Sequence, residues 1–160
     1  MLFSSKKTVE MLSPCNGRAI VLSDVPDEAF ASGMLGSGFA VLPSSGDVLA
    51  PISGRVESVA DGKHAYTIVA DVGADVLVHI GVDTVELSGT PFSPSVKVGD
   101  TVRAGDLLAV ADFSAIRNRG LSDAVIVLVT DTERIEAEEY EYGECKGGKT
   151  PVMRFRIRRN

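Results

Sequence analysis

The sequence has few of the residues that cross-link a chain or hold it in a membrane. Only two of its 160 residues are cysteines, Cys15 and Cys145, and they lie far apart without metal-binding spacing, so we expect reduced thiols. No stretch approaches the ~20 apolar residues of a membrane span, and residues 1–10 hold no apolar run long enough for a signal peptide. A net charge of -6 disfavours general nucleic-acid binding. These absences favour a soluble, cytoplasmic protein.

Long helical patterns are also scarce, and most of the chain is a succession of short strand-like runs. Gly, Pro, Asp and Ser residues separate these runs, which is typical of strands joined by tight turns. Short helical turns are expected only at residues 27–32 and 112–120. We therefore expect an all-β protein, an antiparallel β-sandwich or barrel with short helical turns. The predicted strands cover residues 19–22, 38–42, 48–50, 54–59, 65–70, 76–80, 107–111, 125–129 and 153–157.

The length of the chain suits one domain with a sizeable core. We expect a short flexible N-terminal segment at residues 1–10 and a single domain at residues 11–160. Near the C-terminus, basic and apolar residues alternate from Arg154 to Arg159. This alternation is typical of an edge strand with a charged solvent face, and it is a less probable contact for nucleic acid or lipid.

Two pairs of segments resemble each other within the chain. Residues 49–56 repeat the pattern of residues 11–19, since each has a proline, then a glycine three residues later, a basic residue and an apolar one. Residues 96–100 and 102–106 form a second, shorter pair. Proline and glycine in this order are typical of turns. The repetition predicts two related strand layers that pack together.

The chain has only two histidines, and each belongs to a strand-like run. A period of two places His79 and Leu77 on one face of the strand at residues 76–80. Imidazole is the side chain best suited to change its charge, or to accept a group, near neutral pH. If the strands that carry His64 and His79 are neighbours, the two rings could face each other across a short gap.

The residues alone leave three interpretations of this pair open. A zinc site would need a third ligand, and the spacing matches no metal-binding motif. Covalent catalysis, in which one imidazole accepts a phosphoryl group and the other binds the phosphoryl oxygens, fits the pair and the glycine-containing turn beside it. Two buried histidines bonded to the backbone are the plainest alternative. The sequence contains neither a Gly-x-Ser-x-Gly elbow nor a phosphate-binding P-loop.

The residues around His79 are more informative than the spacing between the two histidines. Residues 73–87, Gly-Ala-Asp-Val-Leu-Val-His-Ile-Gly-Val-Asp-Thr-Val-Glu-Leu, closely resemble the active-site signature of the glucose-type enzyme IIA domains of the bacterial phosphoenolpyruvate:sugar phosphotransferase system. Residues 50–54, 63–66, Phe92, 96–102 and 105–108 resemble further parts of that family in the same order. The resemblance implies an antiparallel β-sandwich built from a duplicated hybrid motif.

The resemblance also implies a role for each histidine. His79 would accept a phosphoryl group at Nε2 from phosphohistidine on the carrier protein HPr and pass it to a cysteine of the cognate enzyme IIB. His64 would bind the phosphoryl oxygens and assist this transfer. Enzyme IIB would act with the membrane enzyme IIC, which selects the sugar. Neither a metal nor another cofactor is implied, and the cytoplasmic domain would be recruited to the inner face of the membrane through IIB and IIC.

Partner-binding residues follow from the same resemblance. Asp27 and Asp83 correspond to acidic positions that could pair with arginines of a partner. An apolar rim around the site would comprise Ala29, Phe30, Met34, Leu35, Leu77 and Val85. For Phe30 and Leu77, ordinary core packing is the alternative interpretation.

The chain also departs from the family pattern at three positions. Glu28 and Ala60 replace residues that are usually apolar or larger, and Gly62 stands where a threonine that hydrogen-bonds the site is common. A regulatory module of the same fold, whose phosphorylation state controls its binding to other proteins, is the alternative function.

Overall fold

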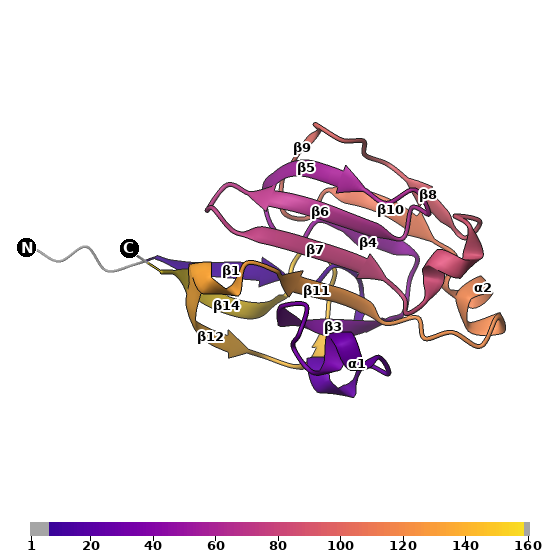
Figure 1. Ribbon diagram of the computed structural model, residues 1–160, viewed down its shortest axis with the longest axis horizontal. Helices are drawn as coiled ribbons and strands as arrows, with labels where there is room; N and C mark the ends of the chain where they lie inside the picture. Colours follow the sequence, from indigo (N-terminus) through magenta and orange to yellow (C-terminus); the bar gives the residue numbers. More distant parts are fainter. Residues whose placement is uncertain (1–6, 159–160) are drawn as a thin grey trace, which may run out of the picture.

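The structure is a computed structural model that describes residues 7–158, and its regular secondary structure is mostly antiparallel strands (Figure 1). The strands are β1 (Thr8–Leu12), β2 (Gly17–Val21), β3 (Ser37–Pro43), β4 (Asp47–Leu49), β5 (Gly54–Val59), β6 (Ala65–Ala70), β7 (Asp75–Ile80), β8 (Phe92–Pro94), β9 (Thr101–Val102), β10 (Leu107–Ala111), β11 (Val125–Val129), β12 (Ile135–Tyr140), β13 (Gly143–Cys145) and β14 (Pro151–Ile157). The helices are α1 (Glu28–Ala31), α2 (Phe113–Asn118) and the 3-10 turns η1 (Leu22–Asp24), η2 (Thr84–Leu87) and η3 (Thr132–Arg134). This arrangement confirms the predicted all-β fold class.

Three sheets enclose the main core. The largest has eight strands in the order β13-β2-β3-β11-β7-β6-β5-β9, and the smaller ones have the orders β4-β10-β8 and β1-β14-β12. Strands β6 and β7 alternate between buried and partly exposed residues along their whole length. Their buried side chains face the two small sheets across a core that includes Phe39, Tyr66, Leu108 and Phe155.

A second, smaller core lies on the opposite face of the large sheet. There α1 lies beside β3 (Figure 1), and side chains of η1 and α1 pack on β3 and β11. The buried side chains of this smaller core are Leu22, Val25, Phe30, Ala40, Val82, Ala124, Ile126 and Leu128. Strand β11 is buried on both faces because the two cores lie on either side of it. The second core therefore holds α1 beside the C-terminal half of β7.

The internal repeat corresponds to a reciprocal contact between its two copies. The backbone N–H of Leu12 donates to the carbonyl of Pro51 (2.9 Å), and that of Leu49 donates to the carbonyl of Pro14 (2.6 Å). The same positions of the two copies therefore bind each other, as expected if an approximate two-fold axis relates them. The prediction that the two related segments pack together is confirmed at this contact.

One expectation about the C-terminal end of the chain is wrong. Strand β14 was expected at an edge, but it lies between β1 and β12, and its Arg154 donates to Glu10 of β1 and to Glu141, the residue after β12. Arg154 binds Glu10 on one side (3.1 Å) and reaches Glu141 on the other (3.5 Å). Residues 8–10 of the predicted flexible segment belong to β1, which pairs with β14, while residues 1–6 lie outside the described part of the chain.

Candidate functional site

His79 lies near the end of β7, on the face of the large sheet that carries the second core. Its neighbours across the strands are Ile126 on β11 and Ala65 on β6. The ring Nδ1 lies 2.7 Å from the carbonyl oxygen of Gly81, so Nδ1 carries the hydrogen and donates it. This bond fixes the tautomer and leaves the lone pair of Nε2 free to act as an acceptor or a nucleophile.

The turn after β7 holds that carbonyl in place. Gly81 and Asp83 both have left-handed backbones, with φ of 78° and 60°. The buried hydroxyl of Thr84 donates to the carbonyl of Ile80 (2.5 Å), and a Cβ on Gly81 would lie only 2.4 Å from Cγ2 of Thr84. The Gly81 position therefore requires glycine both for its backbone angle and for space.

His64 immediately precedes β6 and faces His79. The two ring centroids are 5.1 Å apart and the rings meet edge to face, at 76°. The backbone carbonyl of His64 accepts from Ile80 N (2.7 Å), which joins the two histidine segments next to the rings. His64 is 8% exposed, and no described group hydrogen-bonds its buried Nδ1. The structure thus brings together the two histidines that the sequence analysis singled out.

Helix α1 forms another wall of the site. The carboxylate of Asp27 caps the helix by accepting from the backbone N–H of Phe30 (3.2 Å). The ring of Phe30 lies 5.0 Å from the ring of His79 and tilts by 60° against it. Because Phe30 is only 7% exposed, it acts mainly as a packing residue of the second core and has little surface to offer a partner.

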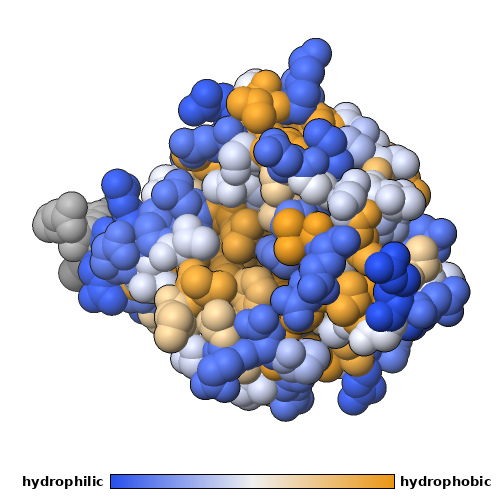
Figure 2. Space-filling model, turned by 45° about the vertical axis from the view of Figure 1, so that its right-hand side comes forward, coloured by the Kyte–Doolittle hydropathy of each residue, from blue (hydrophilic) through white to orange (hydrophobic). Residues whose placement is uncertain are grey.

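The remaining predicted rim residues differ in their exposure. Met34, Val85 and Leu35 expose 76%, 59% and 42% of their surface, an unusual exposure for apolar side chains. Ala29 and Leu77 are half-buried, and Leu77 packs against the second core. Figure 2 shows this side of the molecule, where hydrophobic patches alternate with hydrophilic side chains. An apolar rim of this kind is suited to bind a protein surface.

Burial lowers the pKa of both imidazoles, and the groups around each ring modify this shift. Burial lowers the pKa of His79 below its ordinary value of 6.5, while the Gly81 carbonyl opposes the shift, His64 adds to it, and Asp27 and Asp83 oppose it. Burial likewise lowers the pKa of His64, with a smaller opposing effect from the Gly62 backbone. Both rings are therefore neutral near pH 7, the state in which imidazole is nucleophilic.

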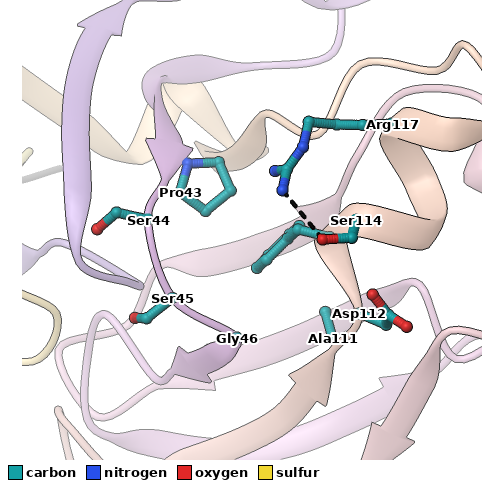
Figure 3. A pocket seen from close by; sticks show the side chains of 9 residues that line it. Pro43, Ser44, Ser45, Gly46, Ala111, Asp112, Ser114 and Arg117 are labelled. Atoms are coloured by element: carbon teal, nitrogen blue, oxygen red, sulfur yellow. Dashed lines mark hydrogen bonds between the residues drawn. The ribbon is translucent and has the colours of Figure 1, made fainter.

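One surface pocket lies away from the histidines, beside α2 (Figure 3). It has a volume of about 310 Å³, and its lining includes three serines, Ser44, Ser45 and Ser114. Its cationic residue, Arg117, binds Asp123 (2.7 Å) and donates to Ser114 (3.3 Å). None of the residues predicted for the site lines this pocket. Nor does any group of three His, Cys, Asp or Glu side chains in residues 7–158 come close enough to hold a metal ion.

Two residues of the site were not singled out for a role by the sequence analysis. Thr84 was only part of the quoted turn, although its position four residues after a strand-end Ile80 is compatible with a side-chain cap on that carbonyl. Gly62 appeared only as a departure from the family pattern. Its proximity to the His64 ring depends on the three-dimensional path of the turn, which the sequence pattern does not give.

Comparison with known proteins agrees with this geometry. A sequence profile of the family described as "phosphoenolpyruvate-dependent sugar phosphotransferase system, EIIA 1" matches residues 9–135. The glucose-specific EIIA component of Oceanobacillus iheyensis is 35% identical over 148 residues, which is 92% of this chain and 90% of that protein. The glucose-specific EIICBA component of Streptococcus pneumoniae is 41% identical over 150 residues, which is 94% of this chain but only 21% of that longer protein.

A solved structure shows the same fold. Glucose permease IIA from Mycoplasma capricolum superposes with a TM-score of 0.84 at 35% identity, and the match covers 96% of this chain and 99% of that one. Within residues 7–158, no helix is long and apolar enough to cross a membrane. The profile, the relatives and the fold agree, and the chain therefore belongs to the EIIA 1 family of the phosphoenolpyruvate-dependent sugar phosphotransferase system, as a phosphocarrier component of that system.

Proposed function

We propose that Nε2 of His79 is the atom that carries the phosphoryl group. The observation that supports this most strongly is the hydrogen bond from Nδ1 of His79 to the Gly81 carbonyl (2.7 Å). It holds the proton on Nδ1 and so keeps the Nε2 lone pair available. Once Nε2 is phosphorylated, the imidazole is itself a good leaving group for onward transfer, and the Gly81 carbonyl stabilises the proton that remains on Nδ1.

In the first step the Nε2 lone pair of His79 forms a bond to the phosphorus of phosphohistidine on HPr. The phosphorus–nitrogen bond of the donor breaks, and its electron pair returns to the donor imidazole. In the second step a cysteine thiolate of enzyme IIB forms the new bond to phosphorus, and the electron pair of the breaking bond returns to Nε2. The transition state is loose, so placement and electrostatic stabilisation supply most of the catalysis.

His64 is proposed to bind the phosphoryl oxygens during both steps. Its ring lies edge-on to His79 with centroids 5.1 Å apart, close enough for a hydrogen bond to a phosphoryl group held between them. The exposed side chains of Met34, Leu35 and Val85 would contact the partner, and Asp27 and Asp83 would attract arginines at its surface. An acidic chain with a net charge of -6 would also steer a basic docking face toward this rim.

Mass spectrometry tests the phosphoryl acceptor directly. The chain is incubated with phosphoenolpyruvate, enzyme I and HPr, and the intact mass and the site of labelling are read at neutral or basic pH, where phosphohistidine survives. One phosphate on the wild type and none on His79→Ala is expected. A wild-type chain that stays unlabelled while the donor system labels another EIIA would overturn the proposal.

We further propose which components receive the phosphoryl group and where in the cell the chain acts. The glucose-specific names of the two relatives favour a glucose system, and the EIICBA arrangement of one of them favours an enzyme IIB and IIC as the next components. We therefore expect the chain in the cytoplasm, recruited to the inner face of the membrane by IIB and IIC. Transfer of label to purified IIB domains specific for different sugars tests this part, and transfer to none of them would contradict it.

A further inference from the structure

We propose that Asp123 is a positioning residue for phosphoryl transfer, because its ion pair with Arg117 holds the loop whose carbonyl groups fix the turn after His79. This loop comprises residues 120–124 and joins α2 to β11. The inference rests on the proposed role of His79 as the phosphoryl acceptor. Asp123 acts only through the backbone of the turn and does not contact the phosphoryl group.

The loop binds two backbone N–H groups of the turn that carries the Gly81 carbonyl. Gly81 N donates to the carbonyl of Ala124 (2.8 Å), which extends the pairing of β7 with β11 past the end of both strands. Val82 N donates to the carbonyl of Ser122 (3.1 Å). Because a peptide unit is planar, this second bond also orients the Gly81 carbonyl, which belongs to the same unit as Val82 N. The loop therefore directs the oxygen that accepts the hydrogen of His79 Nδ1 (2.7 Å).

Asp123 stands between the two loop residues whose carbonyls accept these bonds. Its side chain is 18% exposed, and its carboxylate accepts from Nη1 of Arg117 at 2.7 Å. The other terminal nitrogen of Arg117 donates to the hydroxyl of Ser114 (3.3 Å), the bond that Figure 3 marks with a dashed line. The guanidinium thus ties the middle of the loop to α2 through a short, charge-assisted hydrogen bond.

Helix α2 gives the ion pair a fixed anchor. Its side chains Phe113 and Ile116 are buried in the main core. After the helix, Gly120 N donates to the carbonyl of Arg117 (2.9 Å), and Leu121 N donates to that of Ile116 (3.3 Å). The backbone attaches the loop to the helix as far as Leu121, and the ion pair extends this attachment to the residues that bind the turn.

Loss of the ion pair should therefore loosen the bond that fixes the tautomer of His79. With the Gly81 carbonyl less firmly placed, a larger share of neutral His79 carries its hydrogen on Nε2, the nitrogen that must be free to attack phosphorus. Asp123→Ala should lower the rate of phosphate acceptance from phospho-HPr about twofold to fivefold, the range expected when a partly exposed ion pair is lost.

The other end of β7 offers a matched control. There the carboxylate of Asp131 accepts from Asp75 N (2.9 Å) and lies 3.9 Å from Nε of Arg134, and the Asp131 side chain is 17% exposed. Asp131→Ala thus removes a carboxylate of similar burial from the same strand, at the end opposite His79. It should change neither the tautomer of His79 nor the rate of acceptance. Equal effects in Asp131→Ala and Asp123→Ala would overturn the inference.

The first measurement is the rate of acceptance in Asp123→Ala, in Arg117→Ala and in the double variant. If Asp123 acts through the ion pair, Arg117→Ala causes the same loss, and the double variant loses no more than either single variant. Losses that multiply in the double variant contradict the inference.

The second measurement is the NMR chemical shifts of the two ring nitrogens of His79, which report the tautomer and need no phosphoryl donor. At a pH where the ring is neutral, the wild type should carry the hydrogen on Nδ1, and Asp123→Ala should show a larger share on Nε2. An unchanged tautomer in a folded Asp123→Ala variant would refute the inference even if acceptance is slower. A wild-type chain that accepts no phosphate would instead refute the proposed function and leave this test in force.

Discussion

At the scale of the residue, the two imidazoles are suited to different parts of the proposed transfer because their nitrogens are bound differently. His79 has one nitrogen committed to the Gly81 carbonyl and one free, whereas His64 has a buried nitrogen without a described partner. A fixed tautomer suits a nucleophile, since the lone pair always faces the same way. A ring held by packing suits a binding role, since it can follow the phosphoryl oxygens as they move.

The pKa of His79 offers a first prediction. Burial and the neighbouring His64 lower it, so NMR titration should give a value below 6.5. His79 then remains neutral, and accepts phosphate at an undiminished rate, down to pH values where an exposed histidine is already protonated. Replacing His64 by Gln removes one of the causes and should raise the pKa of His79. A pKa of His79 above 6.5 in the wild type would contradict this account.

The His64→Gln variant carries the second prediction. It should still accept phosphate on His79, because the nucleophile and its bond to Gly81 are intact. Onward transfer to IIB should fall about 100-fold, the typical effect of losing one placed hydrogen-bond donor to developing charge. Rapid-quench measurements of the two steps separate these rates. Unchanged onward transfer would remove His64 from the mechanism.

At the scale of the element, α1 is a four-residue helix that depends on its cap and on the second core. Asp27→Ala removes the cap on Phe30 N and should lower the free energy of unfolding by about 1 kcal/mol. It also removes a negative charge that raises the pKa of His79, so that pKa should fall further. Urea denaturation measures the change in the free energy of unfolding, and NMR titration measures the change in the pKa of His79. Asp61→Ala is the control, and it should change neither.

The strands show how much of the fold could be predicted from the sequence. Strands β6, β7 and β11 were predicted almost to the residue because their apolar patterns are regular. Strand β12 was missed because most of its residues face solvent and their acidic side chains give no alternation. Without β12, the neighbouring β14 resembled an edge strand, although it lies between β1 and β12.

The candidate site, too, could be predicted only in part from the sequence. The two histidines and their turn were recognisable from the sequence, because the signature is continuous over residues 73–87. The burial of Phe30 against His79 could not be predicted, since it depends on η1 and α1 folding back onto β3 and β11. The space beside Gly62 likewise exists only once the β5–β6 turn has its three-dimensional path.

At the scale of the whole molecule, the two copies of the internal repeat make corresponding close approaches. A Cβ on Gly54 would lie 2.3 Å from the carbonyl oxygen of Val69, and one on Gly17 would lie 2.0 Å from that of Leu42. Gly54→Ala and Gly17→Ala should therefore each destabilise the fold by about 2 kcal/mol or more, because a backbone carbonyl cannot yield as a side chain can. Thermal or urea denaturation measures the loss.

Gly120→Ala is the control for this prediction. Nothing lies within 4 Å of a Cβ at that position, so the variant bears only the strain of a left-handed backbone with φ of 75°, about 1–2 kcal/mol. The loss of folding stability in Gly17→Ala and in Gly54→Ala should each exceed the loss in Gly120→Ala. If either repeat variant is as stable as wild type, the backbone at that copy is more adaptable than the close approach implies.

The pairing of β1 with β14 has a consequence for how the domain is attached to other proteins. Thr8 lies opposite Arg156, so the chain enters and leaves the domain side by side, at the end of the molecule away from the C-terminus of β7 (Figure 1). A tether joined at either end would leave the histidine face unobstructed. Such a tether would hold the domain near its acceptor at a high effective concentration, and transfer could then be fast even if docking itself is weak.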